Sequence, residues 1–431
     1  MTRITAIYDI ESPVGLNAAA AVIAGEQSTG TFVKLASETD SLIERSAARV
    51  EQVDVSGVES APALPCKLGG DRYERGRVTI SWPVENVGTS LPNVLATVAG
   101  NLFELAELSA IRLLDIRFPD DFIQALPGPQ FGIGGTRSLT GVNGRPLIGT
   151  IIKPSVGMDP AATAALVEKL LDAGIDFIKD DELQANGPHC PFDERVSQIM
   201  PVIKRHEDKT GKRVMYAFNI TNDIDAMRTN LDRLDELGAT CAMVSLFSIG
   251  LSGLLDVRRH SNLAIHGHRA GWGLYSRSPD IGIAYSVWQK LWRLAGADHL
   301  HVNGLGSKFT EPDSVVAESA CALQQLLTDL PKYQHQALPV FSSAQTIWQL
   351  EPASRLLGND DFLFCAGGGI MSHPGGPGAG VIALQQAAAA AKAGVPIATY
   401  ANEHKELKEA MATFAKPSLS ELSELSERID Q

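Results

Sequence analysis

From Gly144 onward the sequence repeats one pattern eight times, and this repetition constrains the fold more than any other feature. Each unit has a short apolar segment, a turn and a stretch with the apolar spacing of an amphipathic helix. The apolar segments are PLIGTIIKP, DFIKDDE, RVMYAFNIT, CAMVSLF, LAIHGHRA, HLHVNG, ALPVFSSA and DFLFCAGGG. Near-continuous apolar strands suit a parallel sheet that is covered on both faces. Eight such units over about 250 residues predict a closed (β/α)₈ barrel.

The residues before this repetition predict a separate and smaller domain. Strand-like stretches at ITAIYDI, Thr31–Leu35 and RVTISWPVE alternate with helical stretches at Leu16–Ala24 and Leu91–Ala110. This mixture predicts an α+β sandwich, which we class as ferredoxin-like. We therefore divide the chain into an N-terminal α+β domain at residues 1–125, a Gly/Pro-rich connector at 126–145, a catalytic barrel at 146–400 and a helical tail at 401–431.

Composition excludes several classes of partner. The chain has 50 acidic and 37 basic residues and a net charge of −13, which argues against binding to nucleic acid or to an anionic membrane. Its five cysteines are scattered and form no CxxC pair, so we expect neither a disulfide framework nor a zinc knuckle. The first residues lack a signal-peptide pattern, and no apolar run is long enough to span a bilayer. We expect a cytoplasmic protein.

Charged residues end the second barrel strand, at Lys179, Asp181 and Glu182. A run of charges is usually a solvated surface, but this one directly continues an apolar strand. Barrel enzymes place their chemistry at the carboxyl ends of the strands. Asp181 and Glu182 offer the hard oxygen ligands that Mg²⁺ prefers. An ammonium group has no free lone pair, so Lys179 must either neutralise the two acids or be converted to a carbamate.

Other strand ends carry cations and imidazoles. Lys153 ends the first strand, where it is either a surface lysine or a shielded proton-transfer group. His266, His268 and Arg269 lie on the fifth strand, and His299 and His301 lie on the sixth. Arginine binds phosphate or carboxylate with two parallel hydrogen bonds, and histidine transfers protons near neutral pH. We therefore predict an anionic substrate.

Two glycine-rich segments complete the predicted site. The loop NGLGSKF after the sixth strand carries Lys308 and could close over a bound substrate. The seventh strand ends at Ser342, and the eighth runs into Gly367 and Gly368. Glycines can simply form a turn, but after strand eight of a barrel their backbone N–H groups commonly bind phosphate.

Taken together, these motifs resemble the large subunit of ribulose-bisphosphate carboxylase (RuBisCO), over nearly the whole chain. The resemblance implies that carbamylated Lys179, Asp181 and Glu182 bind Mg²⁺ and that Lys153 is the proton-transfer lysine. It implies that His268 and Lys308 are catalytic, with Lys308 on the mobile loop. The implied substrate-binding residues are Arg269, His301, Ser342, Gly367, Gly368, Glu26, Thr31 and Asn101. In the family, the last three reach into the site of a neighbouring subunit, so the resemblance implies a homodimer with shared active sites.

The departures from the family pattern point away from ribulose-bisphosphate carboxylation. Ser155 stands where the strand-one motif has a second lysine, and Ile151 replaces a threonine. Phe32 replaces a tryptophan, and Ser343 and Ala344 replace glycines beside a phosphate site. The chain is identified as a RuBisCO-like protein of the fourth, non-photosynthetic form.

The resemblance implies Mg²⁺-assisted chemistry through an enediolate. Because Lys153, Lys308, both histidines and the acidic motif are kept, the implied substrate is a phosphorylated branched 3-oxo sugar acid of the 3-oxo-isoapionate 4-phosphate type. The reaction would be carboxyl transfer with hydrolytic C–C cleavage, or decarboxylation. The alternatives are a sugar-phosphate enolase or isomerase of the methylthioribulose-phosphate type, a true carboxylase and a non-catalytic homologue.

Overall fold

The computed structural model describes residues 2–30, 35–333 and 335–419. Its backbone contacts separate two compact units. The smaller unit comprises Met1–Pro127, Gly271–Ala295 and Leu327–Gln334, and the larger unit holds the rest of the chain. Within the described ranges, no helix combines the length and the apolar character that a membrane span requires.

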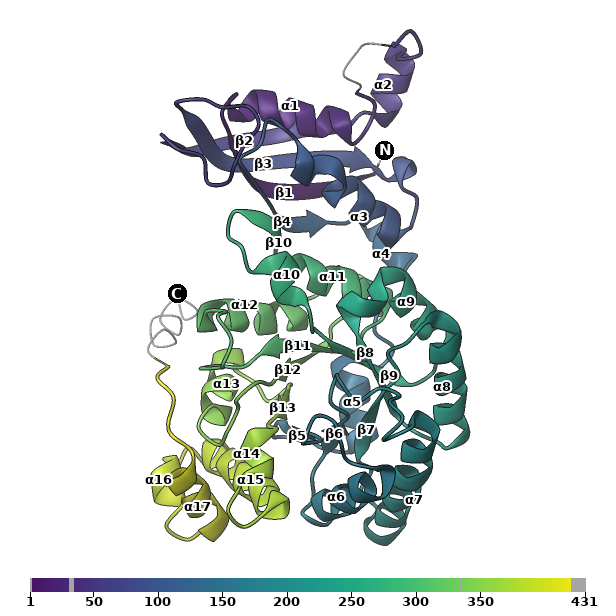
Figure 1. Ribbon diagram of the computed structural model, residues 1–431, viewed down its shortest axis with the longest axis vertical. Coiled ribbons are helices and arrows are strands. Elements are labelled where there is room, and N and C mark those ends of the chain that lie inside the picture. Colours follow the sequence, from purple (N-terminus) through teal and green to yellow (C-terminus); the bar gives the residue numbers. More distant parts are fainter. Residues whose placement is uncertain (1, 31–34, 334, 420–431) are drawn as a thin grey trace. The chain divides into compact units, whose positions relative to one another are not determined.

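The smaller unit is built on a five-stranded sheet in the order β10-β4-β1-β3-β2 (Figure 1). Its strands are β1 Arg3–Ser12, β2 Arg49–Glu59, β3 Tyr73–Pro83, β4 Ala110–Arg117 and β10 Ile281–Ile283. β1 pairs antiparallel with β3 and β4, and β10 adds a parallel edge to β4. With helix α1 (Leu16–Glu26) between β1 and β2 and helix α3 (Leu91–Ala99) between β3 and β4, the first four strands have ferredoxin-like βαββαβ connectivity. The other α-helices of this unit are α2 Asp40–Ser46, α4 Asp120–Gln124, α10 Trp272–Ser276 and α11 Tyr285–Ala295.

Alternation of side chains fixes the buried face of this sheet. Every second residue of β1 is buried up to Ile10, and α1 contributes Leu16, Ala19, Ala20 and Ile23 to the same core. Gly76 of β3 allows this packing, because a Cβ atom there would lie 2.1 Å from the Asp54 carbonyl oxygen and 2.9 Å from Leu16 Cδ1.

One sequence expectation for this unit is wrong, and another lies almost wholly outside the described residues. The helix expected over Leu91–Ala110 ends at Ala99, and Ala110 already opens β4. Gly100 breaks the helix: its ψ angle of −119° is not helical, and a Cβ atom would lie 2.3 Å from the Ala96 carbonyl oxygen. The expected strand at Thr31–Leu35 lies outside the described residues except for Leu35, which is not in a strand.

The larger unit is a closed parallel barrel in the order β11-β12-β13-β5-β6-β7-β8-β9, and β9 pairs with β11 to close it. All eight predicted strands are present, so the (β/α)₈ prediction is confirmed. They are β5 Leu147–Ile151, β6 Phe177–Lys179, β7 Met215–Asn219, β8 Cys241–Ser245, β9 Ala264–His268, β11 His299–Asn303, β12 Leu338–Phe341 and β13 Leu363–Cys365.

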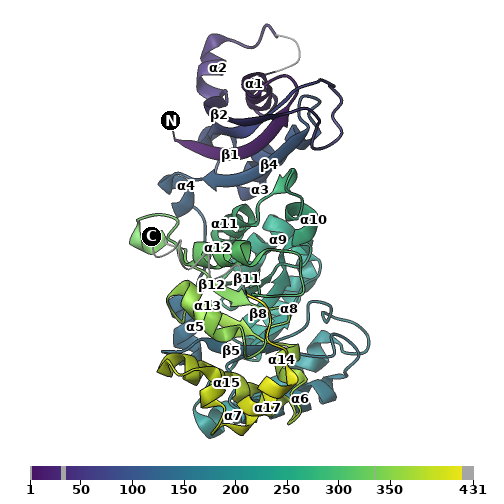
Figure 2. The same cartoon turned by 90° about the vertical axis from the view of Figure 1, so that its left-hand side faces the viewer.

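Helices surround these strands, as the two perpendicular views show (Figures 1 and 2). They are α5 Gly132–Thr140, α6 Pro160–Asp172, α7 Phe192–Thr210, α8 Ile224–Glu236, α9 Leu246–His260, α12 Asp313–Gln324, α13 Leu350–Leu357, α14 Gly368–Met371, α15 Pro377–Ala393, α16 Ile397–Tyr400 and α17 Lys405–Thr413. The barrel interior is filled by side chains such as Leu147, Phe177, Met215 and Val340, so it is a packed core.

Two buried aspartates fasten the amino-terminal end of the barrel. Asp176 and Asp298 each precede a strand within the same Ala-Gly-X-Asp pattern, and both are fully buried. Asp176 accepts a hydrogen bond from the backbone N–H of Ile148 at 2.9 Å, and Asp298 accepts one from Ile265 at 2.8 Å. Their arginine partners are Arg145 and Arg258. Each aspartate thus ties its strand to the neighbouring strand.

Candidate functional site

The acidic motif Lys179–Glu182 lies at the end of β6. We call the carboxyl ends of the barrel strands the barrel mouth, and this motif lies there. The Lys179 side chain is fully buried, and its Nζ donates to the Asp180 carbonyl oxygen at 2.7 Å and lies 3.6 Å from Glu182 Oε2. Asp181 is also buried, whereas the Glu182 side chain keeps 32% of its exposure. The motif is therefore part of a built cluster and not a solvated charge run.

Asp180, within this motif, is held in place by hydrogen bonds from Arg195, Tyr216 and Asn219. Its carboxylate accepts hydrogen bonds from Arg195 Nη2 at 3.1 Å, from the Asn219 backbone N–H at 2.9 Å and from the Tyr216 hydroxyl at 2.7 Å. All of these groups are buried. The buried charge is thus fully hydrogen-bonded, which a charge in the protein interior requires. Burial and the Asp180 carboxylate raise the pKa of the Tyr216 hydroxyl well above its usual value. Sequence reasoning missed this support, because its members share no motif.

Lys153 lies beside the acidic cluster, two residues after β5. Its Nζ contacts Asp181 Oδ2 at 2.5 Å and donates to Ser155 Oγ at 2.8 Å. Ser155, the residue that departs from the family's second lysine, therefore holds the first lysine in place. Gly367 faces the same side chain, since a Cβ atom built there would lie 3.7 Å from Lys153 Cε. The structure thus brings Lys153 together with Asp181 and the glycine segment.

His268 joins the cluster through Glu182, with 3.4 Å between Nε2 and Glu182 Oε2. Its Nδ1 accepts a hydrogen bond from the Ala270 backbone N–H at 3.2 Å, so Nε2 carries the proton of the neutral ring. Burial and then the Lys179 charge lower the pKa of His268 to about 4. Burial raises the pKa of Glu182, but His268, Lys179, a backbone hydrogen bond and Lys153 outweigh it and bring the value to about 2. At neutral pH this pair is therefore a carboxylate beside a neutral imidazole donor.

The other strand-five and strand-six histidines are buried behind His268. His301 Nε2 lies 2.7 Å from His266 Nε2, and His301 Nδ1 lies 2.8 Å from Ser342 Oγ. His299 Nε2 contacts the Thr136 hydroxyl at 2.8 Å. Burial lowers the pKa of His266 and His301 well below the usual value, and it lowers that of His299 to about 3.

These imidazoles predict that acid destabilises the fold. The folded chain keeps His266, His299 and His301 neutral, whereas the unfolded chain protonates each near pH 6.5. Because the folded state binds fewer protons, stability is complete above that pH and is lost as the pH falls below it, by about 1.4 kcal/mol per histidine per pH unit. We expect the melting temperature to drop progressively between about pH 7 and about pH 5. A His299→Gln variant should show a shallower pH dependence, and an equally steep one would contradict this account.

Arg269 is paired with an acid that sequence reasoning missed. Its Nη2 contacts Glu311 Oε2 at 2.9 Å, and the Asn303 side chain donates to the same oxygen at 2.8 Å. All three residues are buried. Asn303 has a φ angle of 74°, a left-handed conformation that asparagine tolerates better than most residues. Glu311 thus links the arginine to the end of the loop that carries Lys308.

Lys308 itself is not joined to the cluster in this structure. It is exposed, and its Nζ lies 5.3 Å from the centroid of the Phe309 ring. At the next strand end, Ser343 and Ala344 have φ angles of 76° and 54°, so they keep a left-handed backbone although they replace glycines. Gly367 is the N-cap of α14 and Gly368 is its first residue, shortly after β13 ends at Cys365.

The remaining predicted residues belong to the smaller unit. Glu26 ends α1 and Asn101 opens a short 3₁₀ helix at Asn101–Glu104; both are exposed. Thr31 and the neighbouring Phe32 lie outside the described residues.

The donor set at the mouth fits a hard divalent cation if Lys179 contributes. Among the described residues, no group of three or more His, Cys, Asp and Glu side chains is arranged to hold a metal ion. Asp181 and Glu182 supply two carboxylates, and the buried Lys179 Nζ lies next to one of them. Carbamylation would replace its ammonium with anionic oxygens, which are suitable ligands for Mg²⁺.

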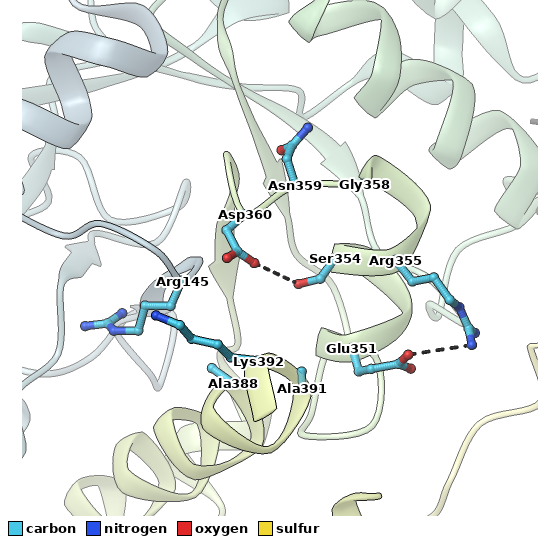
Figure 3. A pocket seen from close by; sticks show the side chains of 10 residues that line it. All are labelled: Arg145, Glu351, Ser354, Arg355, Gly358, Asn359, Asp360, Ala388, Ala391 and Lys392. Atoms are coloured by element: carbon cyan, nitrogen blue, oxygen red, sulfur yellow. Dashed lines mark hydrogen bonds and ion pairs between the residues drawn. The ribbon is translucent and has the colours of Figure 1, made fainter. Parts of the chain in front are cut away.

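A cavity of about 370 Å³ lies at the opposite end of the barrel strands (Figure 3). Arg145 precedes β5, Asp360 precedes β13, and Lys392 comes from the last turn of α15. Several of its polar groups pair locally: Ser354 with Asp360, and Glu351 with Arg355. None of the predicted site residues lines it, so it does not form part of the mouth.

Comparison with known proteins agrees with this architecture. Family models described as the N-terminal and catalytic domains of the ribulose bisphosphate carboxylase large chain match residues 2–122 and 132–414. A Xanthobacter autotrophicus protein named 3-oxo-isoapionate-4-phosphate transcarboxylase/hydrolase is 50% identical, with 95% of this chain and 98% of the relative covered. A Rhizobium etli protein named 3-oxo-isoapionate-4-phosphate decarboxylase is 43% identical, with 96% and 99% covered.

A solved structure supports the same assignment. The crystal structure of a rubisco-like protein from Burkholderia fungorum superposes with a TM-score of 0.89 at 41% identity, covering 96% of this chain and 100% of that one. The match extends over both the sheet domain and the barrel, and the relatives are similar over almost their full length. The chain belongs to the ribulose bisphosphate carboxylase large-chain family.

Proposed function

We propose that the chain acts on 3-oxo-isoapionate 4-phosphate, a phosphorylated branched 3-oxo sugar acid, by carboxyl transfer followed by hydrolytic C–C cleavage. The observation that carries the proposal is the cluster at the barrel mouth, in which Lys153 contacts Asp181 and His268 contacts Glu182. The chain is also 50% identical to a relative named for this reaction. Decarboxylation of the same substrate is the second candidate, and the 43% identity to a named decarboxylase favours it.

The proton-carrying groups suit a reaction that begins with loss of a carboxylate. When a 3-oxo acid loses its carboxylate, an enediolate forms, and the carbon or oxygen that gains charge must then be protonated. Lys153 is an ammonium group paired with Asp181, and the neutral His268 carries its proton on Nε2. Lys153 can therefore donate a proton, and His268 can hydrogen-bond from Nε2 to the oxygen that gains charge. An enolase or isomerase starts instead by removing a proton, which needs an unprotonated base.

The cation is also part of the proposal. Mg²⁺ held by carbamylated Lys179, Asp181 and Glu182 would supply Lewis-acid stabilisation of negative charge on the substrate oxygens. Arg269, His301 and Ser342 would bind one anionic end of the substrate, and Gly367 and Gly368 the other. Lys308 would close over the substrate and hold the carboxylate that leaves or migrates. Water exclusion by this loop strengthens each of these electrostatic contacts.

We also propose a homodimer in which Glu26, Thr31 and Asn101 complete the partner's site. The family resemblance of these positions supports this assembly. Sedimentation under assay conditions tests it, because a fully active monomer would contradict the shared site.

The decisive assay follows a carbon-13 label in the substrate carboxylate. The chain is incubated with 3-oxo-isoapionate 4-phosphate and Mg²⁺, and the products are read by NMR. Carboxyl transfer with hydrolysis should retain the label in one of two smaller acids, whereas decarboxylation should release it as CO₂ or bicarbonate. Solvent-proton exchange without C–C cleavage would indicate an enolase or isomerase. Labelled bicarbonate incorporated into ribulose bisphosphate would indicate a true carboxylase, and no turnover of any branched 3-oxo acid would overturn the proposal.

A further inference from the structure

His266 is a fully buried imidazole that the proposed mechanism does not use. It lies in the middle of the barrel interior on β9, and its relative exposure is 0%. Its Nε2 lies 2.7 Å from His301 Nε2, and the two ring planes are nearly perpendicular at 86°. Among the described residues, its Nδ1 has no hydrogen-bond partner. Only one nitrogen of this ring is therefore engaged.

This asymmetry selects one tautomer. A neutral imidazole has one N–H donor and one lone pair, and the contact between His266 and His301 needs one of each. If His266 carried its proton on Nδ1, a buried N–H would be left without an acceptor. If the proton is on Nε2, only a lone pair is left unpaired. Among backbone groups, buried N–H donors without partners are rarer than acceptors with an unused lone pair, and we apply the same preference to this ring. His266 therefore donates from Nε2 to His301 Nε2.

His299 gives an independent example in the same interior. The Thr136 hydroxyl donates its proton to the Gly132 carbonyl oxygen at 2.5 Å, so its oxygen accepts from His299 Nε2 at 2.8 Å. His299 thus carries its proton on Nε2, and its Nδ1, like that of His266, has no hydrogen-bond partner in the described part of the chain. In His299, the ring nitrogen without a hydrogen-bond partner is thus the one that carries the lone pair, as argued for His266.

The direction of the hydrogen bond between His266 and His301 determines the direction of the next one, between His301 and Ser342. His301 accepts on Nε2, so its proton lies on Nδ1, from which it donates to Ser342 Oγ at 2.8 Å. The Ser342 oxygen then accepts a hydrogen bond from His301, and the Ser342 hydroxyl proton can point toward the barrel mouth. Ser342 directly follows β12 and is buried to 8% exposure at the barrel mouth.

We propose that His266 is a positioning residue that fixes the tautomer of His301 and thereby presents the Ser342 hydroxyl as a donor to an anionic group of the substrate. The proposal rests on the proposed function for the binding role of Ser342 only. Reversing the hydrogen bonds would turn the serine proton inward and would present lone pairs to an anion. Burial supports the neutral state that the argument needs, because it lowers the pKa of both His266 and His301.

Nitrogen-15 NMR of the full chain tests the tautomers without any substrate. The ring nitrogens are labelled selectively in histidine and assigned with His266→Gln and His301→Gln variants, at about pH 8. We expect a protonated Nε2 and a bare Nδ1 for His266, and the opposite pattern for His301. A bare Nε2 on His266 would overturn the proposal even if the enzyme turned over its substrate as proposed.

Kinetics test the consequence for binding. His266→Leu removes the donor and should raise KM by about tenfold with a smaller change in kcat, since one hydrogen bond in an oriented chain is lost. His266→Gln restores an N–H donor and should recover most of the loss. The matched control is His299→Gln, which alters an equally buried histidine whose hydrogen bonds end at Gly132; its KM should stay within about twofold of the parent. Equal KM increases in all three variants would show a merely structural role and would overturn the proposal.

Discussion

Replacing Lys179 with methionine is expected to reduce turnover of 3-oxo-isoapionate 4-phosphate by about 10³-fold. The methionine keeps the buried apolar stem but cannot be carbamylated, so the third protein ligand proposed for Mg²⁺ would be lost. A cation of this kind contributes several kcal/mol of charge stabilisation in a transition state, and about 4 kcal/mol corresponds to the stated rate loss. Steady-state kinetics with saturating Mg²⁺ measures the effect. Carbon-13 NMR with labelled CO₂ should show a carbamate signal in the parent chain that the variant lacks.

Lys392→Met is the matched control for this variant. Lys392 is an exposed lysine in the last turn of α15 and lines the cavity at the other end of the strands. The same substitution there should leave turnover, Mg²⁺ affinity and the carbamate signal unchanged. If Lys179→Met kept more than about a tenth of the parent activity, Lys179 would be a structural counter-ion and not part of a metal site.

Lys153→Ala is expected to lower kcat by roughly 10²–10⁴-fold, the range typical of a lost acid–base group. Its side-chain nitrogen contacts Asp181 at the mouth, and we propose it as the group that protonates the substrate. Phosphate binding by Arg269, His301 and Ser342 should survive, because these proposed anion-binding residues lie on other strands. Single-turnover kinetics together with titration by inorganic phosphate separates the two effects.

Ser155→Ala provides a graded control for Lys153. It removes the second contact of the ammonium group, the 2.8 Å hydrogen bond, but leaves the proton donor in place. A modest loss of kcat, of about tenfold or less, is expected from a single hydrogen bond. If Lys153→Ala reduced phosphate affinity and kcat equally, the lysine would be holding the mouth together and not transferring protons.

The barrel was predictable because each strand is a short apolar run between turn residues. A strand buried on both faces leaves little ambiguity in such a pattern. The smaller sheet was harder: β2 is largely exposed and reads as the polar segment RVEQVDVSGVE, and β4 begins at Ala110, the last residue of the stretch predicted as a helix. Local composition does not reveal an edge strand whose pairing depends on distant residues.

The same limit applies to the site. Residues at strand ends could be listed from the sequence, since the barrel topology brings those ends together. The supporting contacts could not. Arg195 reaches Asp180 from a helix, and Glu311 reaches Arg269 from beyond a loop. Such pairs depend on side-chain directions in three dimensions. The left-handed backbone at Ser343 and Ala344 likewise became visible only in the structure.

The aspartates that precede β6 and β11 hold strands together at one end of the barrel, whereas the residues proposed for chemistry lie at the other end. Asp176 and Asp298 clamp neighbouring strands through backbone N–H groups and arginines, far along the strands from the residues proposed for chemistry. These two strand pairs are therefore held by contacts that involve no side chain at the mouth. Substitutions such as Ser155 or Ser343 can accumulate there without loosening the scaffold. Because these contacts lie at the amino-terminal end of the barrel, residues at the mouth can change in evolution without breaking them. This suits a family whose members carry the names of different reactions.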